Sequence, residues 1–147
     1  MKESINKLNP RHFILVGDEN TWKTALKHHQ WGFSERNVGL WNTTNENDLI
    51  LFYVTKPIQK IIGFGVVRNK FISDEILWPD EIFFKRLVWK YRIKFKVKYL
   101  IKNWESGLSV STDIMLNIGR KVIEKDVYDK FLKEAKLKWN IPSNKFM

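Results

Sequence analysis

The 147-residue sequence contains no cysteine, so it can form neither a disulfide bond nor a thiolate metal site, and it offers no cysteine nucleophile. It also lacks the run of roughly 20 uncharged apolar residues that a membrane-spanning helix requires. Its longest apolar runs, such as LILFYV at 49–54, have the length of a β-strand. The opening segment, MKESINKLNP, contains no apolar signal-peptide region. These absences predict a cytoplasmic protein that is neither exported nor inserted into a membrane.

Sequence motifs for catalysis and metal binding are also missing. His12, His28 and His29 do not have the spacing of a metal site, and the adjacent His28 and His29 would point apart on a helix. The sequence has no glycine-rich phosphate-binding loop and no nucleophile-elbow serine. Because no nucleophile is paired with a base, we expect a binding protein without catalytic residues, bound metal or cofactor. An enzyme that acts on a nucleotide is the least favoured alternative.

Acidic residues are scarce relative to basic ones, at 16 against 26, which gives a net charge of +10. An excess of this size favours an acidic partner such as nucleic acid, although a lysine-rich soluble surface would also explain it. The hydrophobic content of 44% is sufficient for the core of one ordinary domain. We expect residues 1–11 to form a loosely ordered lead-in and residues 12–147 to form a single domain.

The densest basic stretch lies between Lys85 and Lys102, where eight basic residues occur without an acidic one. Within the segment 88–98, apolar residues alternate with basic ones from Trp89 onward, which predicts a half-buried strand. The basic face of that strand is either a solvated surface or a row that follows a phosphate backbone. The predicted phosphate-contacting residues are Lys90, Arg92, Lys94, Lys96 and Lys98.

Other patterns predict the remaining elements. These are a strand at 13–16, a helix at about 20–29, a loop at 35–47, a hairpin of 49–55 and 60–67, a connection at 68–80, helical turns at 79–86 and 98–104, a strand-like stretch at 108–118, and a helix at about 124–138 packed by Val127 and Phe131. Gly63 and Gly65 suggest a bulge or a close backbone approach in the hairpin. This order predicts a mixed α+β fold, with a strongly bent mixed sheet or small open barrel and helices packed outside.

The sequence contains seven tryptophans. Trp22, Trp89 and Trp139 lie on the apolar faces of predicted elements, so we expect them in the core. Trp31, Trp41 and Trp78 fall in predicted loops or at the ends of elements. There, core packing and stacking on a planar ligand are both possible explanations.

Several segments, taken in order, resemble the EVE domain and its YTH relatives in the PUA-like group, over about residues 12–137. FILVGDENTWKTALKHHQWGF resembles the opening of these domains, and NDLILFYVT with KIIGFGVV resembles the paired strands that follow. VWKYRIKFKVKYLI is similar to the next long strand, and MLNIGRKVIEKDVYDKFLKE is similar to the EVE C-terminus. The small free-standing EVE proteins of archaeal type are the most similar.

The resemblance implies a PUA-like fold that binds DNA or RNA and reads a modified base in an aromatic-lined pocket. By motif position, Trp31 and Trp78 would be walls of that pocket, and Arg120 would meet the phosphate backbone. Gly17, Asp18, Gly32 and Ser34 complete the implied base-binding set. An RNA-associated module of translation or RNA modification that has no base pocket is the alternative. The oligomeric state stays open.

Overall fold

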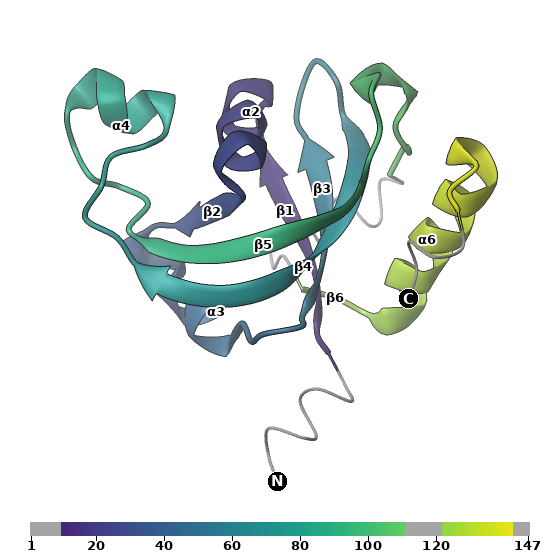
Figure 1. The fold of residues 1–147 in the computed structure, drawn as a ribbon, viewed down its shortest axis with the longest axis horizontal. Helices are drawn as coiled ribbons and strands as arrows, with labels where there is room; N and C mark the ends of the chain where they lie inside the picture. Colours follow the sequence, from purple (N-terminus) through teal and green to yellow (C-terminus); the bar gives the residue numbers. More distant parts are fainter. Residues whose placement is uncertain (1–9, 111–121, 143–147) are drawn as a thin grey trace, which may run out of the picture.

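The computed structural model describes residues 10–110 and 122–142 (Figure 1). In chain order, the elements are β1 (His12–Gly17), α2 (Glu19–His28), β2 (Gln30–Phe33), the 3₁₀ helix η1 (Glu35–Asn37), α3 (Val38–Thr43), β3 (Leu49–Val54), β4 (Lys60–Ile72), α4 (Pro79–Phe84), β5 (Tyr91–Leu100), the 3₁₀ helix η2 (Trp104–Ser106), β6 (Val122–Ile123) and α6 (Lys125–Trp139). No helix in these two ranges is long and apolar enough to cross a membrane.

The strands of the described residues form one sheet in the order β2-β5-β4-β3-β1-β6. β1 and β3 are parallel, whereas the other neighbouring strands are antiparallel. The sheet curls strongly, and its curvature carries β2 toward α2 and α4 at one end (Figure 1). β2 is the edge strand at that end and pairs only with β5 in the described part of the chain.

Successive residues of a strand point to opposite sides of the sheet, and in the central strands both sides are buried. In β1, Phe13 and Leu15 join the core beneath α2, whereas Ile14 joins the core beneath α6. Trp22 of α2 and Phe131 of α6 are among the buried residues that cover the two faces. This two-sided burial explains why the central strands read as continuous apolar runs.

The structure confirms the mixed α+β fold with a strongly bent sheet. The hairpin and the strand predicted at 88–98 belong to the same sheet, as β3, β4 and β5. The terminal helix is α6, in which Phe131 is buried and Val127 is half-buried against the core. The β-bulge predicted from Gly63 and Gly65 is also present: pairing shifts at Phe64/Gly65, and a side chain at either glycine would collide with a carbonyl oxygen of β5.

Several predicted boundaries are wrong. Trp31 lies in β2 (Gln30–Phe33) and not in a loop, and the predicted loop at 35–47 contains η1 and α3. β4 extends to Ile72 through residues that we assigned to a connection, because it pairs with β5 as far as Tyr91. β5 likewise continues to Leu100, where we expected a helical turn, and the 3₁₀ turn comes later, at η2. Of the strand-like stretch at 108–118, Leu108 forms an isolated bridge with Ile61, and 111–118 lies outside the described residues.

Candidate functional site

A pocket of about 380 Å³ lies beside the edge strand β2. Its lining comes from the end of β1 and the start of α2, from β2 and η1, and from the connection between β4 and β5. The lining residues are Val16, Gly17, Thr21, Trp31, Gly32, Ser34, Arg36, Asn37, Trp78 and Trp89. The volume falls in the range of about 300–1,000 Å³ that small-molecule pockets occupy. The site therefore has room for a planar ligand between walls that carry three tryptophans.

The first wall is Trp31, which β2 positions by pairing Trp31 with Ile93 of β5. The Trp31 ring lies against Trp22, with ring centroids 4.4 Å apart, and the Trp31 side chain is 5% exposed. Trp22 is itself fixed, because its Nε1 donates a hydrogen bond of 2.7 Å to the Tyr53 carbonyl oxygen. Trp31 is therefore a core residue that also lines the pocket, and stacking of its ring on a planar ligand stays a prediction.

Two glycines allow the tryptophan walls to approach the backbone. A Cβ atom on Gly17 would lie 2.7 Å from Cη2 of Trp31, and a Cβ on Gly32 would lie 2.5 Å from Cβ of Trp89 and 3.2 Å from Cζ3 of Trp78. The resemblance placed Gly32 in the base-binding set, which would leave the space beside it to the ligand. Trp89 and Trp78 occupy that space instead, so Gly32 is needed for packing of the walls.

The second wall, Trp78, is held by a buried carboxylate. Glu81 in α4 is fully buried and accepts hydrogen bonds from four backbone N–H groups: Leu77 at 2.8 Å, Trp78 at 3.2 Å, Val88 at 3.0 Å and Trp89 at 2.9 Å. Burial raises the pKa of the Glu81 carboxyl, but the four donors outweigh it, so the pKa lies below that of an ordinary glutamate. One ionised side chain therefore holds both sides of the connection that carries Trp78 and Trp89.

Arg92 supports the same wall, and its predicted role as a phosphate contact is wrong. Its side chain is 1% exposed, its guanidinium lies 5.0 Å from the centroid of the Trp78 ring, and its Nη2 lies 3.5 Å from Glu81 Oε1. Its Nε also donates to the Trp89 carbonyl oxygen at 2.9 Å, and its Nη1 donates to Ser73 Oγ at 3.0 Å. The connection at 73–90 folds over this part of β5, which the alternation of the strand could not reveal.

The other predicted phosphate-contacting residues differ in their surroundings. Lys94 and Lys96 are exposed, Lys98 is half-buried, and the Lys90 Nζ forms an ion pair of 3.2 Å with Glu35. Lys94 and Lys96 alternate with buried residues, so they extend from the sheet face opposite the core beneath α2. Arg120 lies outside the described residues.

Ser34 and Asp18, two further predicted site residues, differ in whether they line the pocket. Ser34 lines the pocket as expected. Asp18 is exposed and lies outside the lining, and it acts as the N-cap of α2 by accepting a hydrogen bond of 2.7 Å from the Thr21 N–H. The base contact that the resemblance implied for Asp18 does not agree with this position.

Sequence reasoning missed five lining residues: Val16, Thr21, Arg36, Asn37 and Trp89. Trp89 was assigned to the core because it begins the alternating pattern of the strand. Arg36 and Asn37 follow Trp31 within the same short segment, and that proximity was the available signal. Arg36 is exposed and is the only charged residue of the described lining. Among residues 10–110 and 122–142, no cluster of histidine and carboxylate side chains could hold a metal ion.

No protein-family model matches the sequence, and no curated protein is significantly similar to it. Solved structures are similar in fold. The NMR structure of Rpa0253 from Rhodopseudomonas palustris has a TM-score of 0.56 at 10% identity, covering 86% of this chain and 94% of that one. The YTH domain-containing protein Mmi1 in complex with RNA has a TM-score of 0.55 at 16% identity, covering 87% and 80%. A second Mmi1 YTH domain complex with RNA has a TM-score of 0.51 at 16% identity, covering 87% and 77%. The chain therefore has a YTH-like fold.

Proposed function

We propose that this protein is a reader of the EVE/YTH type that binds single-stranded nucleic acid, RNA in the first instance, and holds one modified base between Trp31 and Trp78. The observation that carries the proposal is the pocket of about 380 Å³, whose walls are indoles from two distant segments of the chain. The YTH-like fold supports it, since two of the similar structures are complexes with RNA. The protein acts by binding and needs no catalytic residue.

The energetics of base capture suit this pocket. Removing a base from its stack costs a few kcal/mol, and stacking on an aromatic side chain returns about 1–3 kcal/mol per base. A methyl group on the base adds about 0.8 kcal/mol when it is buried against an apolar wall. Trp31 is already fixed on Trp22, and Trp78 is already fixed by Glu81 and Arg92. Because the walls are ordered before binding, little of this gain is spent on ordering side chains.

The path of the phosphate backbone follows from the exposed cations near β2. Arg36 lies in the pocket lining, and Lys94 pairs across the strands with Gln30, the first residue of β2. Lys96 continues the same row along β5. A strand whose base enters the pocket would leave a neighbouring phosphate near Arg36, and it would pass around the edge strand β2 to reach Lys94 and Lys96 on the opposite face of the sheet. Such contacts give affinity without sequence preference.

A second candidate function is an RNA-associated module that uses this basic row and leaves the pocket empty. The burial of the two walls favours it, because Trp31 and Trp78 are only 5% and 2% exposed, whereas Lys94 and Lys96 lie fully on the surface. In that case binding would depend on charge alone.

A binding screen tests both candidates. Fluorescently labelled single-stranded RNA and DNA of one sequence would be titrated with the purified protein, with the central base unmodified or methylated. We expect tighter binding to one methylated form. We also expect Arg36→Ala to weaken binding of the methylated and unmethylated forms alike, and by more than Arg68→Ala, which removes an exposed cation outside the described lining. Binding that ignores every base modification would leave the second candidate, and absence of binding to all oligonucleotides at low salt would reject both.

A further inference from the structure

We infer that the Trp78 indole N–H is a hydrogen-bond donor to the bound base, so that the pocket selects a neutral base with an in-plane acceptor and rejects methylated bases that carry a positive charge. This inference rests on the proposed function and specifies its ligand. Its starting point is that Nε1 of Trp78 is buried and has no hydrogen-bond partner among the described residues, in a side chain that is 2% exposed.

Among the described residues, Trp78 Nε1 is the buried side-chain polar atom that has no hydrogen-bond partner. Four other tryptophans of the described chain donate through Nε1 to an acceptor within the protein: Trp22 to Tyr53 at 2.7 Å, Trp41 to Arg92 at 2.9 Å, Trp89 to Asp80 at 3.0 Å and Trp139 to Ser106 at 3.2 Å. A buried donor without an acceptor is unfavourable and needs an explanation. In a residue that lines a pocket, an acceptor on the ligand is the direct explanation.

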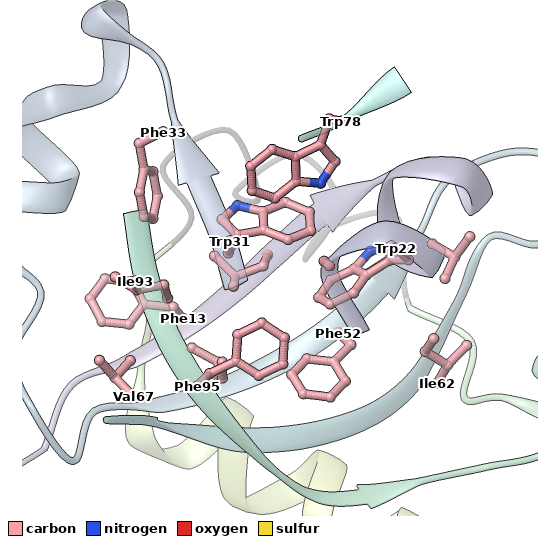
Figure 2. Packing of buried hydrophobic residues seen from close by; sticks show 14 of the residues in the cluster. Phe13, Trp22, Trp31, Phe33, Phe52, Ile62, Val67, Trp78, Ile93 and Phe95 are labelled. Atoms are coloured by element: carbon pink, nitrogen blue, oxygen red, sulfur yellow. The ribbon is translucent and has the colours of Figure 1, made fainter. Parts of the chain in front are cut away.

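The Trp78 ring cannot easily turn to find another partner. Its backbone N–H is bound to Glu81, and the Arg92 guanidinium covers the ring at 5.0 Å. Figure 2 shows the Trp78 nitrogen on the edge of the ring that faces Trp31, which is the other wall of the pocket. An indole N–H donates and never accepts, so the atom that meets it must be an acceptor such as a carbonyl oxygen or an unprotonated ring nitrogen.

The charge of the lining leads to the same ligand class. Arg36 is its only charged residue among those described, and no carboxylate lies in it. Gly17 also lines the pocket, but its carbonyl oxygen already accepts a hydrogen bond of 2.9 Å from the Thr55 N–H and so does not need a donor on the base. Methylation of a base at a ring nitrogen that gives a cation removes an in-plane acceptor and places a positive charge near Arg36. Such a base can no longer accept a hydrogen bond at that ring nitrogen, and its positive charge is repelled by the Arg36 guanidinium.

The test compares two methylated cytosines of equal size in one single-stranded RNA. 5-Methylcytidine is neutral and keeps its ring-nitrogen acceptor, whereas 3-methylcytidine is cationic and has no such acceptor. Binding would be followed by affinity and by the indole N–H signals of the ¹⁵N-labelled wild-type protein. The Trp78 indole N–H signal would be assigned from its through-space contacts with neighbouring protons in the wild-type protein. The assignment therefore does not require a Trp78 variant that folds. Trp78→Phe and Trp139→Phe then form a matched pair, because Trp139 lies outside the pocket lining and its indole N–H is already bonded to the Ser106 carbonyl oxygen.

We expect at least roughly tenfold weaker binding of the cationic base, as loss of a buried hydrogen bond implies. We also expect the Trp78 N–H signal to move downfield with the neutral base. Trp78→Phe should reduce the discrimination between the two bases, whereas Trp139→Phe should retain it. Two results would overturn the inference and leave the proposed function intact. One is equal or tighter binding of 3-methylcytidine. The other is a Trp78 N–H signal that stays in place, or that moves upfield as the signal of an N–H facing an aromatic ring does. If neither RNA binds, the proposed function fails and the inference fails with it.

Discussion

The guanidinium of Arg92 lies 5.0 Å from the centroid of the Trp78 indole ring, and both side chains are almost completely buried. Arg92 comes from the sheet, and Trp78 comes from the connection that folds over it. Glu81 links Arg92 to Trp78, because its carboxylate forms an ion pair with the guanidinium and accepts a hydrogen bond from the backbone N–H of Trp78. One pocket wall therefore depends on a buried ion pair and the hydrogen bonds around it.

Glu81→Gln should destabilise the protein by about 3–5 kcal/mol, because it leaves the Arg92 charge buried without its partner and places an amide group among backbone donors. Chemical denaturation with urea measures the change. The control is Glu134→Gln, which removes an exposed carboxylate from α6 and should change the stability by less than about 0.5 kcal/mol. A loss below about 1 kcal/mol for Glu81→Gln would show that the carboxylate does not hold the wall.

The same carboxylate predicts loss of stability in acid. Since the folded-state pKa of Glu81 lies below the ordinary value of 4.5, the unfolded chain takes up the proton first as the pH falls. The stabilisation is therefore complete above about pH 4.5 and is lost as the pH falls through the lower folded-state pKa. The difference in unfolding free energy between wild type and Glu81→Gln should be constant from about pH 7 to about pH 5 and should shrink below about pH 4.5. A difference that grows in acid would contradict this assignment.

The glycines of the pocket should be irreplaceable, in contrast to an exposed glycine elsewhere. Gly32→Ala would place a Cβ 2.5 Å from Cβ of Trp89, so it should cost about 1–3 kcal/mol and disturb the Trp78 wall. Gly39→Ala meets nothing within 4 Å on the surface of α3, and should stabilise the protein by up to about 1 kcal/mol. Thermal unfolding and oligonucleotide binding of the two variants measure the contrast. Equal behaviour would mean that Trp89 can retreat from Gly32 without cost.

The exposed lysines of β5 should set the salt dependence of nucleic-acid binding. Replacing Lys94 and Lys96 by glutamine should lower the slope of log affinity against log salt by about 0.7–0.9 for each phosphate that is no longer neutralised. Lys130→Gln with Lys133→Gln on α6 removes the same charge from a helix that packs at the far end of the sheet, and should leave the slope unchanged. Equal slopes for the two double variants would make the row on β5 an ordinary solvated face.

Local patterns predicted the central fold well. The apolar runs of β3 and β4, the alternation in β5 and the four-residue repeat in α6 each determine an element by themselves. Prediction failed where an element depends on a distant partner. β2 is four residues long and exists because Trp31 pairs with Ile93, and the end of β4 is polar but pairs with β5 as far as Tyr91. These segments carry little signal of their own.

The site was predictable only in part, for the same reason. Trp31 and Trp78 were placed by motif position, and both line the pocket. Arg92 was misplaced because the sequence does not reveal that residues 73–90 cover its strand face. Glu81 was missed altogether. An acidic residue in the first turn of a short helix suggests a solvated helix end, whereas this one is buried beneath four backbone donors.

The second wall of the pocket has no continuous stretch of chain as its scaffold. Trp78 and Glu81 lie in one connection, and the Arg92 guanidinium that covers the indole ring comes from the following strand. Residues 77–89 transplanted into another protein would bring the indole and its backbone anchor but would leave the ring uncovered and the Glu81 carboxylate without its counter-ion. The binding site therefore forms only when the sheet is assembled. It can be neither excised as a peptide nor transferred to another protein as a loop.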